Sequence, residues 1–271
     1  MITIEIMGGL GNQLFQIFTL ISHSLDNNFE FFFEQKQIRN GHRKVTYWND
    51  FLISLKKYVK QQSHGKIFHE QVFHYIPLPQ KDNIKLVGYF QSSKYFERNL
   101  TAIYKLINLE PQRLVIREKY NYNYNNICSL HFRIGDYAKI QHFHPLMPLK
   151  YYVTALKKLI SLTGSAEWKI LYFYEKKDHN VVAEQIVKLK QKSALSQLKF
   201  IPIRYSIADW EQILVMSNCK HNIIANSTFS WWGAYFNTNK NKIVCYPEKW
   251  FGYALEYNTD DLFPSTWTKI I

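Results

Sequence analysis

The sequence of 271 residues is poor in several features that mark particular classes of protein. It has three cysteines, far apart and odd in number, so neither a disulfide framework nor a zinc site with paired ligands is expected. No apolar run approaches the roughly 20 residues of a membrane span. The first residues lack the basic and then apolar stretch of a signal peptide. These absences favour a cytoplasmic protein with buried free thiols.

Acidic residues are scarce as well, with 21 Asp and Glu against 34 Lys and Arg and a formal net charge of +13. Such a balance favours an anionic partner, which can be a phosphorylated substrate, a polyanion or an anionic membrane face. The lysines are scattered and no nucleic-acid recognition motif occurs, so nucleic acid is not expected as a partner. Peripheral attachment to the inner face of a membrane stays open.

Motifs for several kinds of nucleotide chemistry are missing. There is no Asp-x-Asp spacing to hold a divalent cation. A Walker A sequence and a Gly-x-Ser-x-Gly elbow are also absent. If the chain binds a diphosphate, cationic side chains and backbone N–H groups have to neutralise it, and neither a metal nor another cofactor is expected.

The chain does contain an alternation of apolar strand patterns and amphipathic helix patterns, which implies parallel sheets covered by helices. An Asn- and Tyr-rich tract at 118–126 resembles a linker. We therefore predict an α/β fold with two Rossmann-like halves, 1–120 and 121–271, and a cleft between them. Residues 34–85 show no clear pattern. Strands are expected at 2–6, 29–33, 85–90, 128–132, 170–174, 200–203, around 223 and at 242–245, and helices at 13–25, 94–109, 149–162, 181–198, 206–218 and from 229.

Parallel sheets bind ligands at the carboxyl ends of their strands, and three polar motifs follow predicted strands. The first is a glycine loop, in which Gly9 and Gly11 match the start of a dinucleotide fingerprint but Leu14 stands where the third glycine belongs. A nicotinamide oxidoreductase therefore remains an alternative. Asn12 and Gln13 supply side-chain amides at the tip of this loop, which favours a loop that faces a ligand over a simple tight turn.

The second motif combines His131, Arg133 and Asp136. Residues 131 and 133 of a strand point to the same side, so the imidazole and the guanidinium would reach one site together. The planar fork of an arginine suits phosphate oxygens, and Asp136 could orient Arg133 through an ion pair. A structural Arg–Asp pair beside a core histidine is the alternative.

The third motif, at 225–235, is a strand end, a polar turn and the start of a helix. Backbone N–H groups, hydroxyls and the positive end of the helix dipole converge there, which makes it a natural seat for phosphate. A capped helix with two core tryptophans uses the same donors and is the alternative. The candidate substrate-binding residues of this motif are Asn226, Ser227, Thr228, Phe229 and Ser230.

Taken together and in this order, the motifs resemble the bacterial α-1,2-fucosyltransferases of glycosyltransferase family 11. The resemblance implies a GT-B-like arrangement and GDP-β-L-fucose as the donor, held mainly by the C-terminal half. It also implies metal-independent transfer, with inversion, to a hydroxyl of an oligosaccharide acceptor. The matching segments are 8–16, 88–92, 131–137, 151–152 and 219–234.

The resemblance also implies roles for single residues. Arg133 would stabilise the departing diphosphate and Asp136 would hold the motif in shape. His131 would line the nucleotide pocket, and Asn12 would lie near the reacting carbon. The candidate catalytic residues are thus Arg133, Asn12 and Asp136, and the candidate substrate-binding residues outside the third motif are His131, Gly9, Gly11 and Asp209.

Two positions depart from the family pattern. Ile134 stands where the family usually has a second arginine, and Gln212 stands where it tends to have an aspartate, with Asp209 and Glu211 nearby. The guanine contact is therefore left open. The general base is open as well, because a pairing with Arg133 would make Asp136 a poor base, and His23, His142 and His144 are the other titratable candidates. A transferase for another GDP-6-deoxyhexose or for a protein acceptor, and a catalytically silent protein that binds sugar nucleotides or polyanions, are the remaining alternatives.

Overall fold

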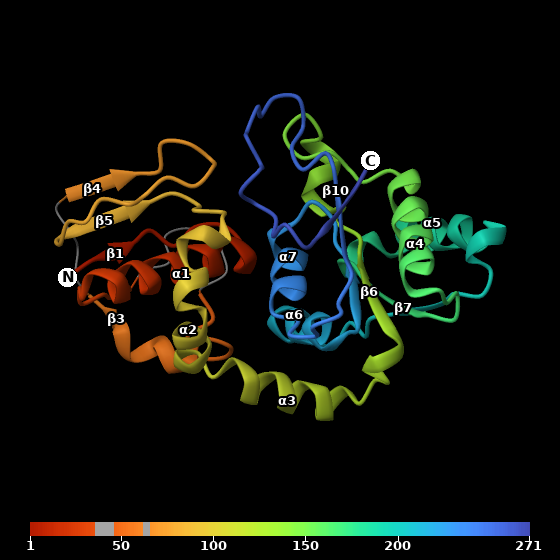
Figure 1. Cartoon of the computed structure of the whole chain (residues 1–271), viewed down its shortest axis with the longest axis horizontal. Helices are drawn as coiled ribbons and strands as arrows, with labels where there is room; N and C mark the ends of the chain where they lie inside the picture. The colour runs from red at the N-terminus through yellow and green to blue at the C-terminus, as the bar shows by residue number, and fades with distance from the viewer. Residues whose placement is uncertain (36–45, 62–65) are drawn as a thin grey trace. The chain divides into compact units, whose positions relative to one another are not determined.

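A computed structural model describes residues 1–35, 46–61 and 66–271 of the chain. The chain divides into two compact units (Figure 1). The first unit is Met1–Leu114 with Tyr257–Pro264, and the second is Val115–Glu256 with Ser265–Ile271. Each unit is built around parallel strands, so the predicted α/β class is confirmed.

The division falls close to the predicted boundary, but its details differ. The predicted linker at 118–126 is wrong, because helix α3 (Leu109–Tyr120) runs into this tract and a short 3-10 turn, η4 (Tyr124–Asn126), follows it. The aromatic ring of Tyr124 is buried, which a solvated linker would not allow. In addition, the segment 257–264 returns to the first unit.

The second unit contains a six-stranded, fully parallel sheet in the order β11-β10-β9-β6-β7-β8. If the six strands are numbered 1 to 6 along the chain and the sheet is read from β8, the order is 3-2-1-4-5-6, as in the dinucleotide-binding doubly wound fold. Its direction reverses between β6 and β9, where such folds bind their ligands. The strands are β6 (Ile127–His131), β7 (Lys169–Phe173), β8 (Lys199–Pro202), β9 (His221–Ile223), β10 (Val244–Pro247) and β11 (Thr268–Ile270).

Helices cover both faces of this sheet, with α4 and α5 on one side and α6 and α7 on the other (Figure 1). Close packing of α6 on α7 depends on Gly233, because a Cβ at this position would lie 2.7 Å from Cβ of Met216. The helices are α4 (Leu149–Thr163), α5 (His179–Lys190), α6 (Asp209–Asn218) and α7 (Thr228–Tyr235), with short 3-10 turns η5 (Gly135–Lys139), η6 (Lys176–Asp178) and η7 (Ser193–Leu195).

The sequence patterns located most elements of the second unit, and the exceptions have local causes. The helix predicted over 181–198 ends at Lys190, and β11 follows no strong apolar pattern and was not predicted. Helix α6 begins at Asp209 instead of Ser206. The Glu211 carboxylate accepts the Ala208 N–H at 3.1 Å, but alanine has no hydroxyl to reciprocate, so only half of a capping box forms.

The first unit has much shorter strands. Its main sheet has the parallel order β1-β5-β4, and β2 pairs with β3. The predicted strands at 2–6 and 85–90 shrink to two and four residues, and a broken series of turns and α2 replaces the helix predicted over 94–109. The unread segment 34–85 contains β3 and β4 and includes 36–45 and 62–65, which lie outside the described residues. The elements are β1 (Thr3–Ile4), α1 (Leu10–Asn27), β2 (Phe33–Glu34), η1 (Ile53–Tyr58), β3 (Val59–Lys60), β4 (Lys66–His69), β5 (Ile84–Val87), η2 (Ser93–Tyr95), η3 (Glu97–Asn99) and α2 (Leu100–Leu106).

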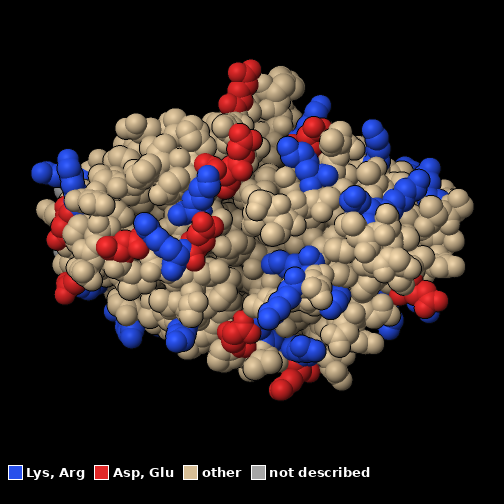
Figure 2. Space-filling model, in the orientation of Figure 1, with Lys and Arg blue, Asp and Glu red and all other residues tan. Residues whose placement is uncertain are grey.

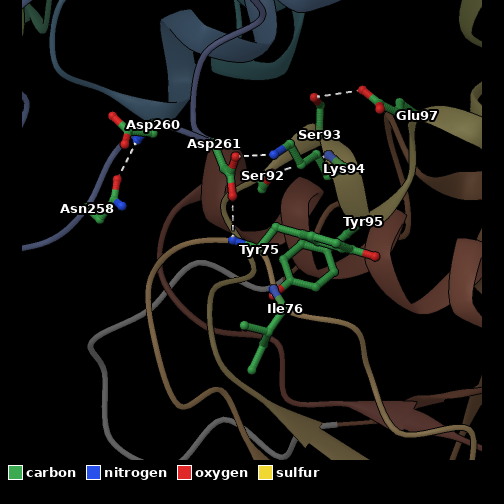
Figure 3. Close-up of polar contacts among 10 residues, drawn as sticks. All are labelled: Tyr75, Ile76, Ser92, Ser93, Lys94, Tyr95, Glu97, Asn258, Asp260 and Asp261. Atoms are coloured by element: carbon green, nitrogen blue, oxygen red, sulfur yellow. Dashed lines mark hydrogen bonds and ion pairs between the residues drawn. The ribbon is translucent and has the colours of Figure 1, made fainter.

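The segment 257–264 belongs to the first unit because polar and aromatic contacts fasten it there. The Asp261 carboxylate accepts the Tyr75 backbone N–H at 3.1 Å and pairs with the Lys94 ammonium (Figure 3). The ring of Tyr257 stacks on Phe73 at 5.0 Å between centroids. A stretch close to the C-terminus thereby holds two loops of the N-terminal unit.

The surface and the thiols agree with the composition. Cys128, Cys219 and Cys245 are buried and form no disulfide, as predicted. None of the helices among the described residues is both long and apolar enough to cross a membrane. On the face shown in Figure 2, lysines and arginines are spread over the surface with acidic residues between them.

Candidate active site

Two of the predicted motifs meet at the point where the order of the second sheet reverses. β6 and β9 are parallel neighbours, with Leu130 opposite Ile223, so their carboxyl ends lie at the same edge. The His131–Tyr137 motif follows β6 and the Asn226–Ser230 motif follows β9. The topology therefore places both motifs side by side in one unit.

Tyr137 joins the two motifs. Its ring lies 4.7 Å from the Arg133 guanidinium, and its hydroxyl donates a hydrogen bond to the Asn226 carbonyl at 3.3 Å. The Tyr137 ring also stacks on the His144 ring, with 4.6 Å between ring centroids. The sequence analysis gave Tyr137 no role of its own, although an aromatic residue directly after an Arg–Asp motif is a usable signal for a cation–π contact.

Arg133 is held by two carboxylates. Its guanidinium pairs with Asp136, as predicted, and also with Glu175, which in turn accepts from the Lys177 ammonium at 2.9 Å. Burial alone would lower the pKa of Arg133, but Tyr137, Asp136 and Glu175 raise it, so the side chain stays charged. The predicted Arg133–Asp136 pair is therefore part of a larger ion-pair network.

Glu175 was missed because it is distant in sequence, 42 residues after Arg133. It follows β7, the strand beside β6, so the sheet order brings it to the same edge. The turn between Arg133 and Asp136 needs a glycine. Gly135 has a φ of +42°, and a Cβ there would lie 2.8 Å from a Glu175 side-chain oxygen. The Gly135 N–H donates to Asp178 at 2.9 Å, which fixes the turn.

His131 is a neutral histidine at the end of β6. The residue is 7% exposed, and burial together with the charge of Arg133 lowers its pKa to about 3. Its ring lies 5.7 Å from that of Phe229, between centroids. Its Nδ1 atom is buried and has no hydrogen-bond partner among the described residues. A buried polar atom without a partner is costly, which fits an atom that serves a ligand.

The start of α7 differs in detail from a capped helix. Ser227 occupies the N-cap position, but its hydroxyl makes no capping bond, and the Ser230 hydroxyl donates to the Ser227 carbonyl at 3.3 Å. The Asn226 amide donates to the carbonyls of Pro145 and Trp250 at 2.9 and 3.2 Å, while its Oδ1 atom is buried without a partner in the described part of the chain. Thr228 is the first helical residue, and Trp231 and Trp232 are fully buried packing residues, as expected.

Helix α4 secures the strand ends beneath this site. The Tyr152 hydroxyl donates to the His131 carbonyl at 3.2 Å, and the Tyr151 hydroxyl contacts the carbonyls of Ile224 and Cys245. Both phenols are buried. The Tyr151-Tyr152 pair thus ties three neighbouring strands together at their carboxyl ends.

The acidic residues at the start of α6 divide into two roles. Glu211 is buried and accepts from the Lys119 ammonium at 2.7 Å and from the Tyr120 hydroxyl at 2.8 Å, so it serves the fold. Asp209 is the first residue of α6, is partly exposed and accepts the Trp210 N–H at 2.9 Å. Of the two, Asp209 remains the better candidate for a ligand contact.

The glycine motif lies in the first unit, and its description needs a correction. α1 begins at Leu10, so Gly11 and Asn12 lie in the first turn of the helix and not in a loop. The residue whose backbone requires glycine is Gly8, with a φ of +74°, whereas a Cβ at Gly9 would meet open space. The side-chain Oδ1 atom of Asn12 accepts from the Gln91 side-chain amide at 3.2 Å, which brings the segments 8–16 and 88–92 together.

No group of three or more His, Cys, Asp and Glu side chains within residues 1–35, 46–61 and 66–271 is arranged to hold a metal ion. The cationic groups described at the edge of the second sheet are the side chains of Arg133 and Lys177. Metal independence itself stays a prediction.

Comparisons with known proteins show which proteins this chain is similar to. No family model matches the chain. It is 32% identical over 185 residues to the O-antigen biosynthesis glycosyltransferase WbnK of Escherichia coli, covering 64% of this chain and 57% of that protein. It is 28% identical to an E. coli alpha-1,2-colitosyltransferase, covering 98% and 97%, and 24% identical to a Caenorhabditis elegans galactoside 2-alpha-L-fucosyltransferase, covering 100% and 79%.

The matched region thus spans little more than half the length of the first relative and nearly all of the second. A family 9 glycosyl transferase from Veillonella parvula is a distant structural neighbour, with 6% identity, a TM-score of 0.44 and coverage of 99% of this chain and 85% of that one. No inference is drawn from a likeness at this level.

The chain is thus similar over nearly its whole length to glycosyltransferases that transfer colitose or fucose. Its homologues include α-1,2-colitosyl- and fucosyltransferases, in agreement with the resemblance to the α-1,2-fucosyltransferases of glycosyltransferase family 11.

Proposed function

We propose that the protein transfers L-fucose from GDP-β-L-fucose to a hydroxyl of an oligosaccharide, with inversion and an α-1,2 linkage. The observation that carries the proposal is the contact chain from Arg133 through Tyr137 to Asn226 at the switch point of the second sheet. These contacts join the Arg133 guanidinium to the N-terminus of α7. A fixed cation and free helix N–H groups both stabilise an anionic leaving group. The similarity to an alpha-1,2-colitosyltransferase and to a galactoside 2-alpha-L-fucosyltransferase supports the sugar and the linkage.

The site offers complementary groups for each part of the donor. Negative charge develops on the diphosphate as the glycosidic bond breaks, and the Arg133 guanidinium stabilises it. Asp136 and Glu175 orient that guanidinium before the donor arrives. The unpartnered buried atoms Nδ1 of His131 and Oδ1 of Asn226 suit polar groups of the nucleoside.

Because Arg133 and the start of α7 can neutralise the diphosphate, we expect transfer without a divalent cation. Asn12 and Gln91 supply amide groups in the first unit, which is assigned to the acceptor in this proposal. The second unit is assigned to the donor.

A second donor is favoured by one comparison. The relative matched over 97% of its length is named an alpha-1,2-colitosyltransferase. Colitose is the 3-deoxy analogue of L-fucose, so the same site could select between them through the group that meets the 3-hydroxyl.

The direct test incubates the purified chain with GDP-fucose, GDP-colitose, GDP-mannose and GDP-rhamnose against a panel of oligosaccharide acceptors, with product analysis by mass spectrometry and NMR. Each reaction is run with EDTA and with Mn²⁺. We expect an α-1,2-fucosylated product in both conditions. Binding of GDP without transfer of any sugar would reject the enzymatic proposal, and activity that EDTA abolishes and Mn²⁺ restores would reject metal independence.

A further inference from the structure

The carboxyl edge of the first sheet holds a half-buried acid, Glu70, that the proposed function does not yet use. β4, β5 and β1 are parallel neighbours, and polar residues follow all three at the same edge. Glu70 comes directly after β4 and continues its pairing, because its N–H donates to the Val87 carbonyl at 2.8 Å. Gly88 follows β5, and the glycine motif that starts α1 follows β1.

The Glu70 carboxylate is held against the turn after β5. Its two oxygens accept the backbone N–H groups of Tyr89 and Phe90 at 2.7 and 2.9 Å. A Cβ at Gly88 would lie 2.3 Å from Cβ of Glu70, so the missing side chain at position 88 makes room for the acid. Each carboxylate oxygen has a second lone pair that can still accept a proton or a hydrogen bond.

The turn itself has a conformation that is rare for its residues. Phe90 is fully buried and has a φ of +51°, which a bulky side chain adopts only when its surroundings enforce it. Such strain clusters at functional sites. The turn delivers Gln91, whose amide donates to Asn12, into the same edge.

Two amide oxygens at this edge lack partners. Oε1 of Gln91 and Oε1 of Gln13 are buried without a hydrogen-bond partner among the described residues, and the two side chains belong to residues that are 6% and 3% exposed. Their amide nitrogens are engaged, with Asn12 and with the Gly8 carbonyl at 3.0 Å. Buried acceptors of this kind suit a ligand that donates several hydrogen bonds, as a sugar does through its hydroxyls.

The charged and titratable groups near Glu70 include no cation that pairs with it within the described part of the chain. Tyr95 is the phenol whose pKa Glu70 influences, and Tyr95 in turn lies near Tyr75 and Asp261. The Asp261 charge is neutralised locally by Lys94 (Figure 3). Tyr95 itself accepts the Ile76 N–H at 3.3 Å and packs edge-on against Phe90 at 5.5 Å.

We propose that Glu70 is the general base of the transfer, and that the amide oxygens of Gln91 and Gln13 bind hydroxyls of the acceptor sugar. This assignment rests on the proposed function. The acceptor oxygen forms the new bond to the anomeric carbon as the bond from that carbon to the diphosphate breaks. The electron pair of the broken bond leaves with GDP, and the hydroxyl proton moves to the Glu70 carboxylate.

The acidity of Glu70 suits this role. Burial raises its pKa to about 7, although the two N–H groups act in the opposite direction. A base works best when its pKa lies near the pH at which the reaction runs.

The test compares Glu70→Gln, Glu70→Asp and the control Glu97→Gln, which alters an exposed glutamate of the same unit that accepts from the Ser93 hydroxyl (Figure 3). Transfer is measured from pH 5 to 9, together with GDP binding by calorimetry and thermal unfolding. We expect Glu70→Gln to lower kcat by about 10²–10⁴-fold, with GDP binding within twofold of wild type. Glu70→Asp should retain part of the activity, and Glu97→Gln should retain all of it.

The pH profile separates a base from an anchor. The wild-type rate should fall below a pKa near 7, and the residual rate of Glu70→Gln should not depend on pH in this range. A folded Glu70→Gln protein within threefold of wild type, or a wild-type profile that is flat between pH 5 and 8, would overturn the assignment. If Glu70→Gln does not fold, the wild-type profile and Glu70→Asp decide. Failure of the wild type to transfer any sugar would reject the proposed function as well, and is therefore distinguishable.

Discussion

The two units hold the carboxyl ends of their strands in place by different interactions. In the second unit β6, β9 and β10 are buried along their whole length, since helices cover both faces. In the first unit the edge strand β4 is largely exposed, and β1 and β2 have two residues each. Burial on both faces can hold a site in place through packing alone, whereas short exposed strands need polar contacts for the same purpose.

Those polar contacts are visible in the first unit. Gln16 accepts the Met7 N–H at 2.9 Å and donates to the Gly88 carbonyl at 3.0 Å, so one side chain joins two strand ends. Glu70 holds the turn after β5, and Asp261 holds the loops around it. The second unit thus holds a cation, Arg133, in a site fixed by packing. The first unit holds a titratable acid, Glu70, in a site fixed by polar contacts.

Apart from the Glu70 variants, the largest expected effect tests the packed unit. Arg133→Ala should cost about 2.7–4 kcal/mol of transition-state stabilisation, a factor of roughly 10²–10³ in kcat, because the charge on the leaving diphosphate loses its fixed partner. The fold should survive, since the guanidinium is bound by exposed or half-exposed acids. Steady-state kinetics with GDP-fucose measure the loss.

Lys177→Ala is the matched control, because Lys177 is a cation of the same network that contacts Glu175 and is 61% exposed. Its kcat should stay within a few fold of wild type. Equal losses in the two variants would show that net positive charge, and not the placed guanidinium, is what matters.

The next prediction compares the effect of one added methyl group on packing in each unit. Gly233→Ala forces a Cβ against Met216 inside the buried α6–α7 contact and should destabilise the protein by about 1–3 kcal/mol. Gly88→Ala pushes against Glu70 at a half-exposed edge and should lower kcat more than stability. Thermal unfolding and kinetics of both variants check this. A Gly88→Ala protein that loses stability but keeps full activity would contradict the role of this edge in catalysis.

The two units should also respond to pH in opposite directions. Burial lowers the pKa of His131 to about 3, so the stability it supports is present above pH 6.5 and is lost as the pH falls. Burial raises the pKa of Glu70 to about 7, so the stability it supports is present below pH 4.5 and is lost as the pH rises towards 7. One proton changes the free energy of unfolding by at most about 1.4 kcal/mol per pH unit.

Hydrogen exchange followed by mass spectrometry resolves this difference by unit. Peptides from β6 should lose protection, relative to neutral pH, at pH 5, after correction for intrinsic exchange rates. Peptides covering 84–92 should gain protection at the same pH. Parallel changes in both regions would show that a global charge effect dominates, and would remove the contrast between the units.

The smallest effect on stability is expected at Gly9. The position is exposed, and a Cβ there would meet no atom within 4 Å, so Gly9→Ala should change thermal unfolding little. If the predicted role in substrate binding is right, the methyl group should still raise KM for one of the two substrates. Unchanged kinetics would remove Gly9 from the site.

Much of the second unit could be predicted from the sequence because most strands and helices there carry their own periodic pattern. The helices at 149–162 and from 229 and the strands at 128–132, 170–174 and 200–203 appear within a residue or two of the expected positions. The first unit was predicted less well, since strands of two residues are too short to carry a pattern. Their existence depends on neighbours such as β5, with which β1 pairs.

The sequence by itself determined the motifs and the order in which they follow strands, because apolar periodicity and the chemistry of Arg, His, Asn and Ser are local properties. Only the tertiary structure decided which distant residues share an edge. Glu175 reaches Arg133 because β7 lies beside β6, Tyr137 reaches Asn226 because β9 lies on the other side, and Glu70 reaches the turn after β5 because β4 pairs with it. Strand order is set by the packing of whole sheets, and no local pattern encodes it.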